Sequence, residues 1–188
     1  MGYTTEFTGE FVVDRPVEED LLLYIQNFCE VRHMKYDVEK IKADFPNWED
    51  FCYRGDLGRE GEYFVGEVSV FKSPDRKYYK RFSQRDLHLF YDKYAIDQNN
   101  PPTGVPGLWC QWEIPDDKRD VIRWNGTEKF YHYGNWLHYL IEHFLAPNGY
   151  KVNGLVMFRG EFIDDVGFIF VNDNKIHIEK ISLDKGAE

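Results

Sequence analysis

Three carboxylates stand close together near the C-terminal end of the chain, where they could perform chemistry. Glu161, Asp164 and Asp165 fall in one predicted loop between two strand-like segments. Grouped carboxylates can bind Mg²⁺ or divide the roles of general acid and general base. They support one hypothesis, a metal-dependent enzyme that cleaves phosphoryl groups of nucleotides. Acidic turns are also common on a protein whose net charge is −10, so a solvated loop is the alternative.

A basic cluster between Lys72 and Arg85 contrasts with the acidic character of the whole chain. This stretch contains six basic residues and one acidic residue, with Tyr78, Tyr79 and Phe82 interleaved. Cations can hold a phosphate while an aromatic ring stacks on a base. The cluster therefore predicts ligand contacts, for which the best candidates are Lys77, Lys80 and Arg81. A solvated basic face that offsets the surrounding acids is the alternative.

The segment PPTGVPGLWCQW, at 101–112, concentrates proline, glycine and tryptophan in twelve residues. Prolines stiffen the approach to a strand, and glycines permit turns or close backbone contact. In an extended strand Trp109 and Gln111 share one face, while Cys110 and Trp112 share the other. One interpretation is a rigid entry to a central strand. The other is an aromatic wall of a ligand site, formed by Trp109, Gln111 and Trp112.

Other catalytic patterns are absent from the sequence. His138 and Glu142 are four residues apart on one predicted helix, but no HExxH motif and no further zinc ligands accompany them. Cys29, Cys52 and Cys110 match no metal-binding spacing, and we interpret them as buried thiols. The sequence contains no GxSxG motif and no phosphate-binding glycine loop. It favours a non-enzymatic protein and predicts no cofactor.

Composition and charge narrow the classes of partner. An acidic chain repels nucleic acid, so direct nucleic-acid binding is not expected, although an acidic decoy for a DNA-binding protein is a further alternative. No secretory signal opens the sequence, and no apolar run is long enough to cross a bilayer. We therefore expect a protein of the cytosol without membrane contact.

Hydrophobic periodicity predicts an α+β fold, with an antiparallel or mixed sheet and two main helices on one face. A single domain over 1–188 is expected from the length, with an irregular middle region at 37–100 that could be an insertion and a frayed tail at 184–188. The predicted strands are 3–14, 62–71, 109–114, 121–124, 150–159, 166–171 and 176–181. The predicted helices are 16–34, 40–52 with a break near Pro46, 83–95, and a long one after an Asn125–Glu128 capping box.

Several of these segments also carry a resemblance. NNPPTGVPGLWCQW, EKFYHYGNWLHYLIEHFLAPNGYKVNG and GEFIDDVGFIFVNDNKI resemble a family of small accessory proteins of tailed phages and prophages. The opening YTTEFTGEFVVDRP and the segment containing EVRHMK are similar too, whereas 37–100 is not. The resemblance implies a protein made in a bacterial cytosol that antagonises or tunes a host system. It implies no activity and no site residues.

Together these observations predict a non-enzymatic protein that acts by occupancy. Its expected partner is a small anionic ligand, such as a nucleotide, or a host protein. The metal-dependent enzyme and the acidic decoy are the alternatives. The sequence leaves the oligomeric state open.

Overall fold

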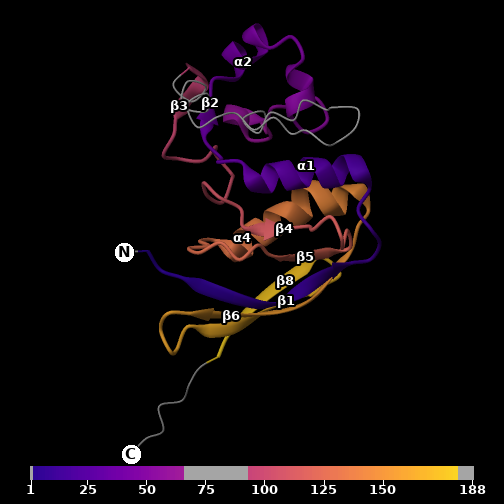
Figure 1. The fold of residues 1–188 in the computed structure, drawn as a ribbon, viewed down its shortest axis with the longest axis vertical. Coiled ribbons are helices and arrows are strands. Elements are labelled where there is room, and N and C mark those ends of the chain that lie inside the picture. Colours follow the sequence, from indigo (N-terminus) through magenta and orange to yellow (C-terminus); the bar gives the residue numbers. More distant parts are fainter. Residues whose placement is uncertain (1, 66–92, 182–188) are drawn as a thin grey trace, which may run out of the picture. The chain divides into compact units, whose positions relative to one another are not determined.

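The computed structural model describes residues 2–65 and 93–181, and the chain divides into two compact units (Figure 1). The first unit combines Met1–Leu22 with Gln111–Glu188, and the second comprises Leu23–Cys110. The second unit therefore lies between two parts of the first in sequence. It contains the expected irregular region at 37–100 but extends beyond it at both ends. The expected frayed tail at 184–188 lies outside the described residues.

The first unit is built on a six-stranded antiparallel sheet, which confirms the α+β class. Its strand order is β4-β5-β1-β6-β7-β8. The strands are β1 (Thr5–Val13), β4 (Trp112–Glu113), β5 (Val121–Trp124), β6 (Val152–Gly160), β7 (Val166–Asn172) and β8 (Lys175–Lys180). The predicted C-terminal meander is confirmed by β6, β7 and β8, and the predicted pairing of the two tryptophan strands is confirmed by β4 and β5.

One face of this sheet carries the core of the first unit. Alternate residues of β1 and β6 are buried there, including Phe11 and Phe158, which are both 0% exposed. The helix α4 (Tyr133–Leu140) packs on this face, where the Tyr133 ring lies 4.9 Å from Phe7 and 5.4 Å from Phe158. Burying such rings provides roughly 1.5–3 kcal/mol for each side chain. These aromatic contacts fix the helix against the sheet.

The long helix begins later than the sequence predicts. The expected capping box at Asn125 and Glu128 is not formed, because the Asn125 carboxamide instead accepts a bond from Thr127 N at 2.9 Å. The Gln111 side chain donates to the Glu128 carbonyl at 3.0 Å. Lys129 and His132 both have positive φ angles, which interrupt the helix until Tyr133. Beyond α4 the chain continues as a π-helical segment, Ile141–Leu145, and a short 3₁₀ turn, Ala146–Asn148.

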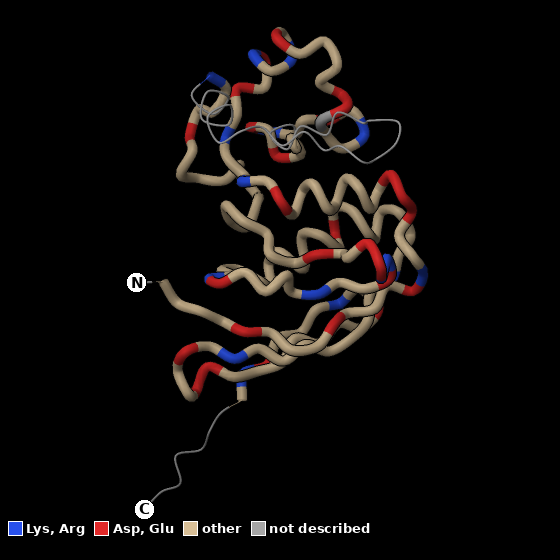
Figure 2. Tube along the Cα trace, viewed as in Figure 1, with Lys and Arg blue, Asp and Glu red and all other residues tan. Residues whose placement is uncertain are grey.

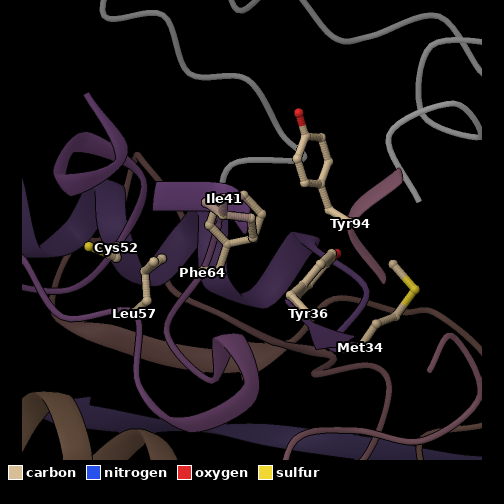
Figure 3. Packing of buried hydrophobic residues seen from close by; sticks show 7 residues of the cluster. All are labelled: Met34, Tyr36, Ile41, Cys52, Leu57, Phe64 and Tyr94. Carbon is tan, nitrogen blue, oxygen red and sulfur yellow. The ribbon is translucent and has the colours of Figure 1, made fainter. Parts of the chain in front are cut away.

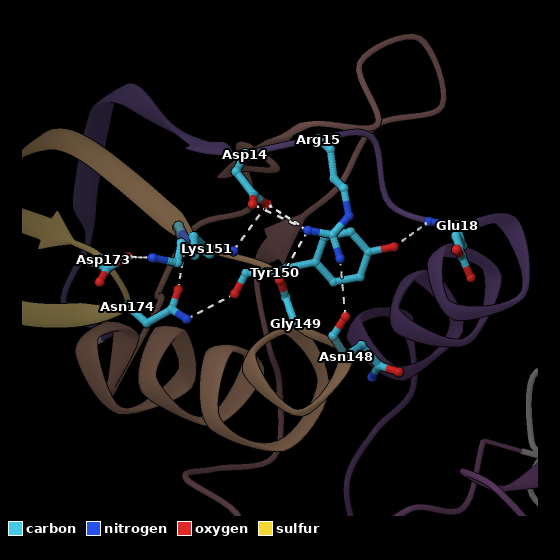
Figure 4. A network of polar contacts seen from close by, with 10 residues as sticks. Asp14, Arg15, Glu18, Asn148, Gly149, Tyr150, Lys151, Asp173 and Asn174 are labelled. Atoms are coloured by element: carbon cyan, nitrogen blue, oxygen red, sulfur yellow. Dashed lines mark hydrogen bonds and ion pairs between the residues drawn. The ribbon is translucent and has the colours of Figure 1, made fainter.

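A polar junction closes the end of this helical stretch against the sheet (Figure 4). The Arg15 guanidinium donates to the carbonyls of Gly149 at 3.0 Å and Asn148 at 3.2 Å, and it lies 4.1 Å from the centre of the Tyr150 ring. A cation is favourable beside the last carbonyls of a helix, because these carry partial negative charge. Asn174, in the β7–β8 turn, donates to the Tyr150 carbonyl at 2.9 Å.

The second unit contains less regular secondary structure than the first unit, and it has its own core. Its elements are the body of α1 (Glu19–Glu30, whose first turn belongs to the first unit), β2 (Lys35–Tyr36), α2 (Val38–Asp44), two 3₁₀ turns (Trp48–Phe51 and Arg59–Gly61) and β3 (Ala95–Asp97). Strands β2 and β3 are antiparallel. Figure 3 shows the buried cluster around them, which consists of Met34, Tyr36, Ile41, Cys52, Leu57, Phe64 and Tyr94.

The second unit tests several of the predicted helices and strands. The break near Pro46 is confirmed, because α2 ends before it and a 3₁₀ turn follows it. Residues 62–65 do not form the predicted strand, and the rest of that segment lies outside the described residues. Most of the predicted helix at 83–95 also lies outside them, and Ala95 belongs to β3.

Two expectations concern the helices. The predicted packing of two main helices on one sheet face is not confirmed, because α4 occupies that face while α1 is divided between the units.

None of the helices within 2–65 and 93–181 combines the length and apolar character that a membrane crossing requires.

Candidate interaction site at the β6–β7 hairpin

The connection between β6 and β7 exposes two large apolar side chains. Phe162 is 66% exposed and Ile163 is 80% exposed, and both lie among the three carboxylates that the sequence singles out. Folding normally removes such side chains from water, and interaction surfaces keep them accessible. We call Glu161–Asp165 the hairpin tip.

Hydrogen bonds hold the hairpin tip to the start of β1. The Tyr3 hydroxyl donates to Asp165 Oδ2 at 2.6 Å, and the Thr4 amide donates to Glu161 Oε1 at 2.7 Å. Lys180 Nζ, at the end of β8, lies 2.7 Å from Asp165 Oδ1. Within the tip, the Asp165 amide donates to the Phe162 carbonyl at 3.0 Å. Contacts from the start of β1 and the end of β8 therefore fix this loop.

Aromatic rings add to this support. The Tyr3 ring lies 5.4 Å from the Phe162 ring, and the Tyr131 hydroxyl, on a side chain that is 50% exposed, accepts a bond from the Tyr3 amide at 3.1 Å. Such ring contacts contribute about 0.5–1.5 kcal/mol beyond the area they bury. The exposed Phe162 is thus positioned before any partner arrives.

The charges at the tip are stabilised by their neighbours. Hydrogen bonds from Lys180 and then Tyr3 lower the pKa of Asp165, so this carboxylate stays ionised at neutral pH. The same Asp165 hydrogen bond raises the pKa of Lys180. Burial, followed by the charge of Asp165, raises the pKa of Tyr133 to about 12. Three carboxylates and one ammonium therefore leave the tip negatively charged.

The structure gives the candidate metal ligands a different role. Both oxygens of Asp165 and one oxygen of Glu161 are already used to bind the tip to β1 and β8. Among the described residues, no group of three or more His, Cys, Asp or Glu side chains is arranged to hold a metal ion. His138 and Glu142 do share a helix face, 3.0 Å apart, and form an exposed pair on it. The arrangement supports a structural clamp better than a metal centre.

The predicted aromatic wall does not form one exposed surface. Trp112 is 0% exposed, and its indole N–H donates to the Tyr133 carbonyl at 2.9 Å. Gln111 is 7% exposed. Both therefore contribute to the core of the first unit, as the interpretation of a rigid strand entry expects.

Trp109 belongs to the second unit and remains 46% exposed. The Arg32 guanidinium lies 5.7 Å from the centre of its ring. Arg32 and Trp109 therefore form a partly exposed cation–π pair. The basic candidates Lys77, Lys80 and Arg81 lie outside the described residues.

Sequence reasoning identified the carboxylates of the tip but missed Phe162 and Ile163. The signal was present, because a turn between two strands normally contains small or polar residues and GEFIDDVG places two large apolar residues there. Comparison with known proteins adds no guide to the site, since no family model, curated protein or solved structure matches the chain.

Proposed function

We propose that this protein binds another protein through the hairpin tip, and that the partner presents an apolar pocket rimmed by Lys and Arg. One observation carries this proposal. Phe162 and Ile163 are 66% and 80% exposed on a loop that hydrogen bonds hold to β1 and β8. The function belongs to the binding class that the sequence predicts.

The energetics favour a hot spot at this position. Burying a large apolar side chain contributes roughly 1.5–3 kcal/mol, so two such side chains could anchor a complex. Because the loop is already fixed, less conformational entropy is lost on binding. The carboxylates around the tip would steer a basic partner and add specificity more than affinity.

A protein partner fits this site better than a small ligand does. Small-molecule sites are concave and enclose most of the ligand surface. The tip instead presents its two apolar side chains outward, and such a shape enters the pocket of another molecule. The acidic-decoy alternative receives little support, since acidic and basic residues are interspersed along the described chain (Figure 2).

Site-specific photocrosslinking in bacterial cells would test this proposal. A photoreactive phenylalanine analogue placed at Phe162 should yield one discrete adduct, which mass spectrometry identifies. The matched control is the same analogue at Ile96, which is 67% exposed and lies in β3 of the second unit. The Asp164→Lys change should reduce the adduct at 162. Equal adducts at both positions, or none at Phe162, would contradict the proposal.

A small anionic ligand is the second candidate, favoured by the Arg32–Trp109 pair in the second unit. An exposed indole can stack on a base while a guanidinium approaches a phosphate. Saturation with a nucleotide should raise the thermal midpoint, because a ligand at about 100 times its Kd adds about 2.7 kcal/mol. The Trp109→Ala variant should lose this shift.

A further inference from the structure

The face of the sheet opposite α4 carries an apolar patch on the neighbouring strands β6 and β7. Leu155 is 47% exposed, Met157 36% and Phe170 38%, and Phe168 is half-buried. They form two cross-strand pairs, Leu155 with Phe170 and Met157 with Phe168. We call these four residues the outer patch. An antiparallel sheet with one solvated face normally alternates apolar and polar residues, so these strands depart from that pattern.

Beside the outer patch itself, the flanking strands are polar on the same face, whereas Val12 further along β1 is apolar and 47% exposed. On β1, Thr8 pairs with Met157 and Glu10 pairs with Leu155. On β8, His177 pairs with Phe170 and Glu179 pairs with Phe168. The face therefore has an apolar centre and two different polar margins, of which the β8 margin also carries Lys175.

We propose that the outer patch is the interface of a two-fold symmetric dimer. The axis would run parallel to the strands, between β6 and β7, so that β6 faces the partner's β7 and β1 faces the partner's β8. Such an interface requires one surface that is complementary to itself. The observed register meets this requirement, because the rotation keeps each residue at its own level along the strands and brings unlike residues together.

The expected contacts across the axis follow directly from the cross-strand register. Leu155 meets the partner's Phe170, and Met157 meets the partner's Phe168. At the margins, the Glu10 carboxylate meets the partner's His177, and the Thr8 hydroxyl can donate to the partner's Glu179. Glu10 already has Lys118 Nζ at 3.5 Å on its own chain, so its charge is not left isolated when water is displaced. Within the outer patch apolar residues thus meet apolar residues, beyond it Val12 meets the partner's Lys175, and neither margin places like charges together.

The size of the face indicates a weak dimer. Four strands about 4.8 Å apart, with about seven residues each at about 3.3 Å, cover about 400 Å² in projection. Stable interfaces bury about 800 Å² on each partner. We therefore expect a reversible dimer with a dissociation constant in the range of about 1–100 µM.

Sedimentation of the full chain from about 1 µM to about 1 mM would test this inference. The wild-type protein should pass from monomer to dimer over this range. The Phe170→Glu variant should weaken dimerisation at least tenfold, because it places a charge in the apolar centre. Ile96→Glu, at a more exposed apolar residue outside the face, should leave dimerisation unchanged. Far-UV circular dichroism and a cooperative melt would establish that each variant is folded.

A mixing experiment tests the direction of the axis. Leu155→Lys and Phe170→Glu should each give a monomeric protein. Mixed together they should form a heterodimer, since one contact then joins the new ammonium to the new carboxylate and the other keeps the original Leu155–Phe170 pair. A self-pairing of β6 with the partner's β6 would not produce this rescue, so its absence overturns the proposed axis.

Other outcomes would overturn the inference altogether. A wild-type chain that stays monomeric across the whole range, or a dimer that Phe170→Glu leaves intact, excludes the outer patch as the interface. The result is independent of the proposed partner site, because Ile163→Ser, combined with the photoreactive analogue at position 162, should reduce crosslinking at the tip and leave the dimer unchanged.

Discussion

At the scale of single residues, burial makes His33 a determinant of the pH dependence of stability. Its side chain is 3% exposed, and burial lowers its pKa to about 3, although a hydrogen bond with the Phe28 backbone opposes this shift. In the unfolded chain the same imidazole takes up a proton near pH 6.5. The unfolded state therefore binds more protons below that pH, and stability falls as the pH decreases from about 6.5 toward 3.

The expected loss of unfolding free energy from His33 between pH 7 and pH 5 is roughly 2 kcal/mol. His33→Phe, which keeps a ring beside Phe28, should flatten the pH dependence in this window whatever its effect on absolute stability. Urea denaturation at several pH values measures the slope. An unchanged slope in the variant would assign the pH dependence to other groups.

Asn174 both forms the β7–β8 turn and joins that turn to Tyr150 and Val152 through hydrogen bonds. It has φ +69°, in the left-handed region, and follows Asp173 at φ +50° in a two-residue hairpin turn. Its carboxamide accepts from Val152 N at 2.6 Å and donates to the Tyr150 carbonyl at 2.9 Å. Two substitutions separate these contributions. Asn174→Gly removes only the hydrogen bonds and should cost about 1–2 kcal/mol, whereas Asn174→Ala should cost about 1 kcal/mol more because of the positive φ. Thermal unfolding would compare them, and equal losses would show that the turn conformation is not the limiting factor.

Of the strand predicted at 109–114 only Trp112–Glu113 forms β4, and the residue types in PPTGVPGLWCQW did not reveal which side chains face water. Trp112 and Gln111 have the chemistry of a ligand wall, yet one is buried under α4 residues and the other bonds the Glu128 backbone. The exposure of a side chain depends on tertiary contacts. When a strand has apolar residues on both faces, its sequence does not show which face is exposed to water.

At the scale of elements, the clamp on the hairpin tip should contribute to stability through Asp165. This carboxylate joins β1 and β8 to the tip, and its side chain is 20% exposed. Asp165→Asn should lower the unfolding free energy at pH 7 by about 1–2 kcal/mol, because charge-assisted hydrogen bonds are lost. Asp164→Asn, in the same loop, should change it by less than about 0.5 kcal/mol.

The pH dependence of the two variants offers a second readout. The folded-state pKa of Asp165 is lowered, so its contribution is present above the pKa of the unfolded carboxyl and disappears as the pH falls through the folded value. The difference between wild type and Asp165→Asn should therefore shrink below pH about 4. If Asp164→Asn were as destabilising as Asp165→Asn, the clamp would not be the cause.

The elements that the sequence predicted well are those whose signals are local. The C-terminal meander follows from alternating strands and an Asn-Asp-Asn turn, and the register confirms it. The predicted start of the helix at the Asn125–Glu128 capping box was wrong, because such a local pattern competes with side chains from elsewhere in the chain, here Gln111. The hairpin tip was only half predicted, because the acidic residues were interpreted without the two apolar residues between them.

At the scale of the whole molecule, the division into two units was not predicted, because no linker composition marks Leu22 and the Pro- and Gly-rich stretch before Gln111 was interpreted as the entry to a strand. The first unit is discontinuous in sequence, and its strands β1 and β6 are joined by pairs such as Thr5 with Gly160. Pairings of that separation leave no local signal. Length alone therefore favoured one domain with an irregular middle.

The two proposals for the first unit together predict bivalent binding. An axis parallel to the strands preserves their direction, so both hairpin tips of a dimer would lie at the same end. A partner immobilised at high density could then engage both tips, and a short linkage gives an effective concentration in the range of about 1 mM. We expect apparent affinity to rise about 10- to 100-fold with partner density for the wild-type protein.

Phe170→Glu should bind with the same affinity at every density, while Phe162→Ser should not bind at all. Surface plasmon resonance against the crosslinked partner would measure these affinities. A wild-type dimer whose affinity does not depend on partner density would show that its two tips cannot act together, and this would place the axis perpendicular to the strands instead.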